Sequence, residues 1–124
     1  MRAKVCVLII VFVCGIFSSM ALGEVEAPEA IKKVAPIYKG AKVIQAIQFQ
    51  EGAQAILEVQ ATPKEVITFY KDTMQQKGWK VVMQMDMENN SMLNLAKDNT
   101  SLVINASAEQ EGKTMVQLIL KTNN

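Results

Sequence analysis

The chain has 124 residues, half of them hydrophobic, with 13 basic and 12 acidic side chains and a formal net charge of +1. This length suits one domain built around one hydrophobic core. The balanced charge, with no cluster of either sign, argues against nucleic acid or an anionic membrane surface as a partner.

The first 23 residues have the layout of a secretory signal peptide. Arg2 and Lys4 give a positive start, an apolar run extends from Val5 to Phe17, and small residues lead to a cleavage site after Gly23. The run is shorter than the roughly 20 residues that a membrane span requires, although retention as an uncleaved anchor stays an alternative. We therefore expect a periplasmic or secreted protein with no stable membrane anchor after cleavage.

Both cysteines of the chain, Cys6 and Cys14, lie inside this predicted signal peptide. Its removal leaves a chain without disulfides, so packing alone must stabilise the fold. Cys14 follows valine and phenylalanine rather than small residues, and this context disfavours lipid attachment.

Residues 24–41 form a lead-in that is acidic, alanine-rich and interrupted by proline, with a helical turn at 30–34 as its only candidate element. Alternation begins after it. Val43, Ile47 and Phe49 are predicted to share one face of a strand that ends at a Glu51-Gly52 turn. Residues 53–60 alternate in the same way, so the two segments predict a β-hairpin.

The segment from Thr62 to Gly78 carries every signal of an amphipathic helix. Thr62 is a good N-cap, Pro63 suits the first helical position, and Glu65 completes a capping box. Gly78 is the expected left-handed stop. The predicted helix runs from Pro63 to Lys77, and its apolar stripe consists of Val66, Ile67, Tyr70 and Met74.

Four more strands follow the predicted helix. In the first, Trp79, Val81, Met83, Met85 and Met87 alternate with polar residues and are predicted to face the helix. Three further alternating segments, separated by short turns, end at Leu120. We expect residues 42–124 to form a single two-layer α+β domain of order β-β-α-β-β-β-β, a mainly antiparallel sheet with one helix packed on one face.

The chain lacks the side chains that most enzymes use. It has no histidine, its one arginine lies in the predicted signal peptide, and no glycine-rich loop joins a strand to a helix. These features remove the usual general base, the bidentate phosphate clamp and the phosphate cradle. We therefore predict a non-catalytic protein with no cofactor.

The face of the sheet that the helix leaves uncovered is the first candidate site. Scattered apolar residues on this face could mark an interaction surface, or could simply reflect the preference of branched residues for strands. These residues are Ile44, Ile56, Val82, Met92, Val103, Met115 and Ile119.

Two smaller candidates remain. Tyr38, in a turn before the first strand, could form a binding tip or a plug that holds the lead-in against the sheet. The thioethers of Met83, Met85 and Met87 could bind Cu(I), a soft ion, or could fill gaps in the core.

The pattern of the chain from Pro36 to Val81 resembles small exported bacterial proteins and lipoproteins of unassigned role. The shared residues are PIYKGA, then ATPKEVITFYK, then KGWKV. The resemblance implies a bacterial exported protein but no catalytic residues. Together these observations predict a non-catalytic binding module for an envelope protein. The alternatives are a structural homo-oligomer that pairs through the open sheet face, and a Cu(I) carrier.

Overall fold

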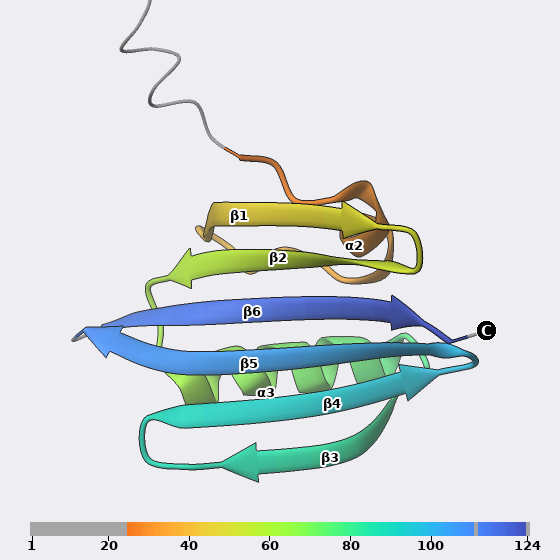
Figure 1. Cartoon of the computed structure of the whole chain (residues 1–124). Coiled ribbons are helices and arrows are strands. Elements are labelled where there is room, and N and C mark those ends of the chain that lie inside the picture. The colour runs from red at the N-terminus through yellow and green to blue at the C-terminus, as the bar shows by residue number, and fades with distance from the viewer. Residues whose placement is uncertain (1–24, 111, 124) are drawn as a thin grey trace, which may run out of the picture.

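The computed structural model describes residues 25–110 and 112–123 of the chain (Figure 1). The predicted signal peptide, residues 1–23, lies outside the described residues. The elements are α2 (Glu29–Val34), β1 (Lys42–Phe49), β2 (Gly52–Val59), α3 (Pro63–Gln76), β3 (Lys80–Asp86), β4 (Asn90–Lys97), β5 (Thr100–Gln110) and β6 (Lys113–Thr122).

The strands form one antiparallel sheet in the order β1-β2-β6-β5-β4-β3. After β2 the chain crosses over through α3 to the far edge of the sheet, and β3 to β6 then return strand by strand (Figure 1). The last strand, β6, therefore lies between β2 and β5 and joins the two parts of the sheet. The order of the elements from β1 onward is the predicted β-β-α-β-β-β-β.

The prediction of a two-layer fold with one helix is wrong, because the described part of the chain is dominated by a six-stranded sheet and has two helices. α3 packs against β3, β4 and β5, whereas α2 packs against β2 and β6. Six strands spaced about 4.8 Å apart are about twice as wide as a helix of about 10 Å diameter. A second helix is therefore required to bury the other half of the same face, and it does so through Ile31.

The predicted helix is confirmed from its start at Pro63, and it ends at Gln76, one residue before the predicted end. The Thr62 hydroxyl accepts a hydrogen bond from the Glu65 N–H at 3.2 Å, and the Glu65 carboxylate accepts one from the Thr62 N–H at 3.2 Å. At the other end, the N–H of Trp79 donates to Met74 O at 3.0 Å across Gly78, whose φ is +91°. This pairing is a Schellman motif, which satisfies the last carbonyls of the helix.

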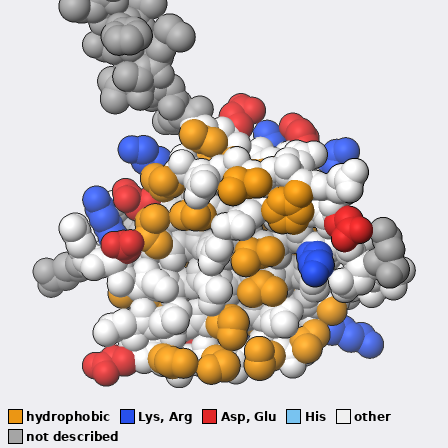
Figure 2. Space-filling view, in the orientation of Figure 1, with side chains coloured by type: hydrophobic (Ala, Val, Ile, Leu, Met, Phe, Trp, Pro, Cys, Tyr) orange, Lys and Arg blue, Asp and Glu red, His pale blue; other side chains and the backbone are white. Residues whose placement is uncertain are grey.

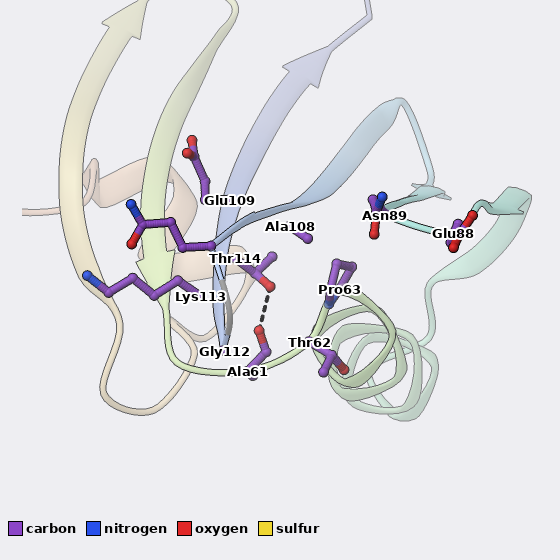
Figure 3. Close-up of a pocket in the computed structure, with 11 residues that line it drawn as sticks. Ala61, Thr62, Pro63, Glu88, Asn89, Ala108, Glu109, Gly112, Lys113 and Thr114 are labelled. Carbon is purple, nitrogen blue, oxygen red and sulfur yellow. Dashed lines mark hydrogen bonds between the residues drawn. The ribbon is translucent and has the colours of Figure 1, made fainter.

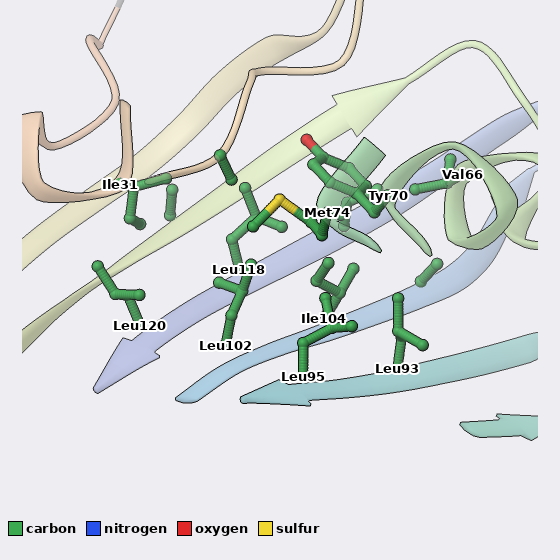
Figure 4. Packing of buried hydrophobic residues seen from close by; sticks show 14 of the residues in the cluster. Ile31, Val66, Tyr70, Met74, Leu93, Leu95, Leu102, Ile104, Leu118 and Leu120 are labelled. Atoms are coloured by element: carbon green, nitrogen blue, oxygen red, sulfur yellow. The ribbon is translucent and has the colours of Figure 1, made fainter. Parts of the chain in front are cut away.

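The core lies between the two helices and the inner face of the sheet (Figure 4). Tyr70 and Met74 of α3 lie over Leu102, Ile104 and other leucines of the central strands, and all of these side chains are fully buried. The predicted stripe of the helix is buried in full: Val66, Ile67, Tyr70 and Met74.

Both edge strands contain a β-bulge that reverses the predicted alternation. In β1 the register shifts between Val43 and Gln45, so Ile44 has no partner in β2. Val43 then faces the core, while Ile47 and Phe49 are exposed. The prediction that all three share one face is therefore wrong, because one extra residue inverts every side chain beyond it.

The bulge in β3 has the same effect on the methionines. The register shifts between Val81 and Met83, so Val82 is the extra residue and is 63% exposed. Val81 still packs against the core, but Met83 and Met85 turn to the opposite face and are 44% and 39% exposed. The prediction that these methionines face the helix is wrong. Met87 lies beyond the end of the strand and is 59% exposed.

Candidate functional site

The register of the strands places two rows of uncharged side chains across the middle of the outer face, the face that the helices leave uncovered. We call them the central rows. One row consists of Ile47, Gln54, Ile119, Val103, Asn94 and Met83, in order from β1 to β3. The other consists of Gln45, Ile56, Gln117, Asn105, Met92 and Met85.

Charged side chains lie at the margin of these rows. The next row on one side of the central rows contains Lys80 and Lys121. The next row on the other side contains Lys42 and Glu58. Glu58 forms an ion pair with Lys113 at 3.7 Å. Figure 2 shows this arrangement, with hydrophobic side chains running over the face and most of the charged ones around it. The middle of the outer face is therefore neutral and rich in apolar and amide groups.

The structure brings together most of the predicted residues of this face. Ile56, Met92, Val103, Met115 and Ile119 are half-buried residues of the four inner strands, with side chains on the outer face. The two other predicted residues are the bulge residues of the edge strands, Ile44 and Val82, which are 41% and 63% exposed.

Four apolar residues of the outer face were not predicted to lie there, namely Ile47, Phe49, Met83 and Met85. Each lies beyond a bulge in its strand. The available signal was a pair of adjacent apolar residues, Val43-Ile44 in β1 and Val81-Val82 in β3, which breaks the alternation at the point of the bulge.

Tyr38 connects the lead-in to α3. Its ring packs edge-on against Phe69 with the ring centroids 5.0 Å apart, and its N–H donates to the Tyr70 hydroxyl at 3.1 Å. The Tyr70 hydroxyl donates in turn to the carbonyl of Pro36 at 2.9 Å. Burial raises the pKa of Tyr70 to about 12, partly offset by the hydrogen bond from the Tyr38 N–H. This placement favours the plug over the binding tip.

An open pocket of about 530 Å³ lies where the start of α3 meets the ends of β5 and β6 (Figure 3). The hydroxyl of Thr114 points to this region, but it donates a hydrogen bond to the Ala61 carbonyl. The Lys113 ammonium is engaged by Glu58. Glu88 and Glu109, also in the lining, are exposed. The pocket thus presents solvated groups and peptide surface, without a reactive pair.

Neither a metal-binding cluster of His, Cys, Asp and Glu nor a membrane-spanning helix occurs within residues 25–110 and 112–123. These residues contain no group of three His, Cys, Asp or Glu side chains that could hold a metal ion. In the same part of the chain, no helix has the length and apolar character needed to cross a membrane.

Comparison with known proteins identifies one family. A family model described as START domain-like matches residues 42–113. This range includes β1 to β5 in full and the first residue of β6. No curated protein and no solved structure matches the chain significantly. The START-like fold is a helix-grip, and this description replaces the predicted fold class. Because the match extends over more than half of its residues, the chain belongs to a START domain-like family.

Proposed function

We propose that this protein is a non-catalytic, exported binding module that binds a partner protein through the outer face of its sheet. The observation that carries the proposal is the pair of central rows, in which twelve adjacent side chains include no charged group. Monomeric proteins rarely leave an extended apolar surface without a use, and charge is depleted at the centre of protein interfaces.

Membership in a START domain-like family favours a ligand-binding module. A ligand between the helices and the sheet would have to displace the core, since Tyr70, Met74 and Leu118 fill that space and are fully buried. The outer face requires no such displacement. We therefore place the binding surface outside the helix-grip rather than within it.

The size of the outer face is sufficient for a specific complex. Six strands about 4.8 Å apart, with about eight residues rising about 3.3 Å each, cover roughly 600 Å². Two such surfaces in contact bury roughly 1,200 Å², which lies at the lower end of the range for specific interfaces. A partner that covers the central rows alone would form a smaller, transient contact.

The chemistry of the central rows favours a foreign partner over a permanent dimer. Amides are interspersed with apolar side chains along both rows, and an amide buried in a dry sheet-on-sheet interface requires a hydrogen-bond partner. The amides are Gln45, Gln54, Asn94, Asn105 and Gln117. A partner with accessible polar groups would satisfy them. A second copy of the chain is the alternative occupant.

Photo-crosslinking in producing cells tests this proposal. A photoreactive residue at Ile56, in the centre of the outer face, is expected to give a discrete adduct, whereas one at Asp72, exposed on α3, is expected to give none. The additional substitution Ile119→Lys places a charge beside the probe and should abolish the adduct while the melting temperature is kept. Equal adducts at Ile56 and Asp72 would contradict the proposal. An adduct of the chain with itself would favour the dimer.

Export is part of this proposal and has its own test. It rests on the predicted signal peptide and on the resemblance to small exported bacterial proteins. N-terminal sequencing of the protein from the periplasm or medium should begin at Glu24. A protein retained in the cytoplasm with Met1 intact would contradict export and leave the binding surface untouched.

A further inference from the structure

The bulge at Val82 creates a cluster of thioethers on the outer face. Beyond this bulge, Met83 and Met85 point away from the helices, and Met85 lies directly opposite Met92 in the register of β3 and β4. Four of the eight methionines of the chain fall within residues 83–92. Three of them thus share one corner of the outer face.

The spacing of these positions allows their sulfur atoms to converge. Side chains directly opposite in an antiparallel pair have Cβ atoms about 4.5–5.5 Å apart, and diagonal neighbours lie about 7–8 Å apart. Met85 and Met92 are an opposite pair, and Met83 is the diagonal neighbour of Met92. Methionine has three rotatable bonds before its methyl group, so three thioethers at these positions can approach one ion.

Burial does not explain the methionines of β3. The side chains beyond the bulge that point to the helix side are Gln84 and Asp86, which are polar, while Met83 and Met85 point to solvent. A strand that only packed its apolar residues would show the reverse arrangement. The thioethers are exposed where polar groups would cost less.

The cross-strand neighbours of the cluster are neutral. Asn94 is the cross-strand partner of Met83, and Asn105 is the cross-strand partner of Met92. Neither asparagine carries a charge. A cation therefore meets no ammonium group among these neighbours, and no carboxylate that would favour a hard cation. Soft thioether ligands without hard oxygen anions select Cu(I) among biological metals.

We propose that Met83, Met85 and Met92 form a binding site for one Cu(I) ion on the outer face of the sheet. Met87 is not part of it, because its side chain lines a small pocket with Thr62 and Pro63 at the start of α3. The site uses one corner of the outer face and does not depend on the protein partner proposed above.

A competition titration with bathocuproine disulfonate, in the presence of ascorbate, tests the site. The protein carries Cys6→Ser and Cys14→Ser so that no thiolate from an unprocessed signal peptide competes for the metal. One Cu(I) per chain is expected. M83L, M85L and M92L are each expected to weaken binding about tenfold or more, equivalent to about 1.4 kcal/mol. Because leucine conserves the volume of methionine, these variants should fold.

Met115→Leu is the matched control, since Met115 lies on the outer face of β6, away from the cluster, and its loss should leave the affinity unchanged. Thioethers do not titrate, so binding should be the same at about pH 5 and about pH 8, unlike binding by thiolate or imidazole. Ag(I) should shift the methyl resonances of Met83, Met85 and Met92 but not that of buried Met74.

Two results would overturn the proposal. One is a wild-type affinity no tighter than that of free methionine. The other is an equal affinity of the wild type and the M83L/M85L/M92L triple variant. Neither result bears on photo-crosslinking at Ile56, so the failure of the metal site and the failure of the partner surface are distinguishable.

Discussion

The hydroxyl of Tyr70 donates a hydrogen bond to the carbonyl of Pro36 at 2.9 Å, across 34 residues of sequence. The same hydroxyl accepts the N–H of Tyr38 at 3.1 Å. One buried phenol of α3 therefore satisfies two backbone groups of the turn that follows α2. Through this contact the lead-in is held against the part of the core that α3 covers.

Replacement of Tyr70 by phenylalanine should remove both bonds and leave two backbone groups without their partner. The expected loss at neutral pH is about 1–3 kcal/mol of unfolding free energy, because each group still has to be desolvated. Urea unfolding measures this loss. A Tyr38→Phe variant keeps both bonds, since Tyr38 contributes only its N–H, and should lose less.

The raised pKa of Tyr70 predicts a loss of stability in alkali. Burial raises this pKa from 10.0 to about 12, so the folded state keeps the proton where the unfolded state releases it. The contribution of Tyr70 to the free energy of unfolding is fully present below about pH 10. It falls by about 3 kcal/mol as the pH rises to about 12. Urea unfolding across this window should show a smaller decline for Tyr70→Phe than for the wild type. Equal declines would contradict the assignment.

The capping box of α3 predicts a loss of about 1 kcal/mol for Thr62→Ala. The substitution removes the acceptor of the Glu65 N–H and the hydroxyl that donates to the Glu65 carboxylate at 3.0 Å. Thr62→Ser retains the hydroxyl and should cost far less. The shift in the urea midpoint distinguishes the two variants, and equal shifts would show that the cap does not stabilise the helix.

The bulge in β3 predicts that deletion of Val82 is tolerated. Val81 and Met83 oppose Leu95 and Asn94, which are consecutive in β4, so the two ends can be joined without a change of register. We expect a folded protein that loses less than about 2 kcal/mol, because Val82 is exposed. Thermal melting followed by circular dichroism measures this.

Deletion of Asn94 is the control for this prediction. Asn94 is paired regularly with Met83 on one side and Val103 on the other, so its loss inverts part of β4 relative to both neighbours. Such an inversion exposes Leu93 or Leu95 and should prevent folding. A protein that tolerates both deletions equally would contradict the bulge.

The close approach of β2 and β6 predicts that Gly52→Ala is strongly destabilising. A Cβ atom at Gly52 would lie 2.0 Å from the carbonyl oxygen of Leu120, so the two strands would have to separate. Gly112→Ala meets no atom within 4 Å, and its cost of about 1–2 kcal/mol comes from its positive φ alone. The melting temperature should fall further for Gly52→Ala than for Gly112→Ala, and the reverse order would contradict the close approach.

Local signals in the sequence were sufficient for α3 and for the alternating strands of the sheet centre. Thr62, Glu65 and Gly78 act on backbone groups only a few residues away, so the helix and its ends follow from the sequence alone. β2, β4 and β6, and β5 as far as Ala108, keep a regular alternation, and their buried faces agree with it. The predicted outer-face residues of these four strands follow for the same reason.

The tertiary structure alone decided the edges of the sheet and the position of the second helix, although the sequence predicted a helical turn at 30–34. Whether Met83 and Met85 face the core or solvent depends on one unpaired residue, Val82, and both phases of the alternation are locally acceptable in an edge strand. α2 has six residues, too few to be stable in isolation, and it forms where Ile31 meets the sheet. The sequence by itself therefore determined the elements with local caps and regular alternation. Only the packed fold decided which side chains the edge strands present to solvent, because register in a strand is set by its neighbour rather than by its own residues.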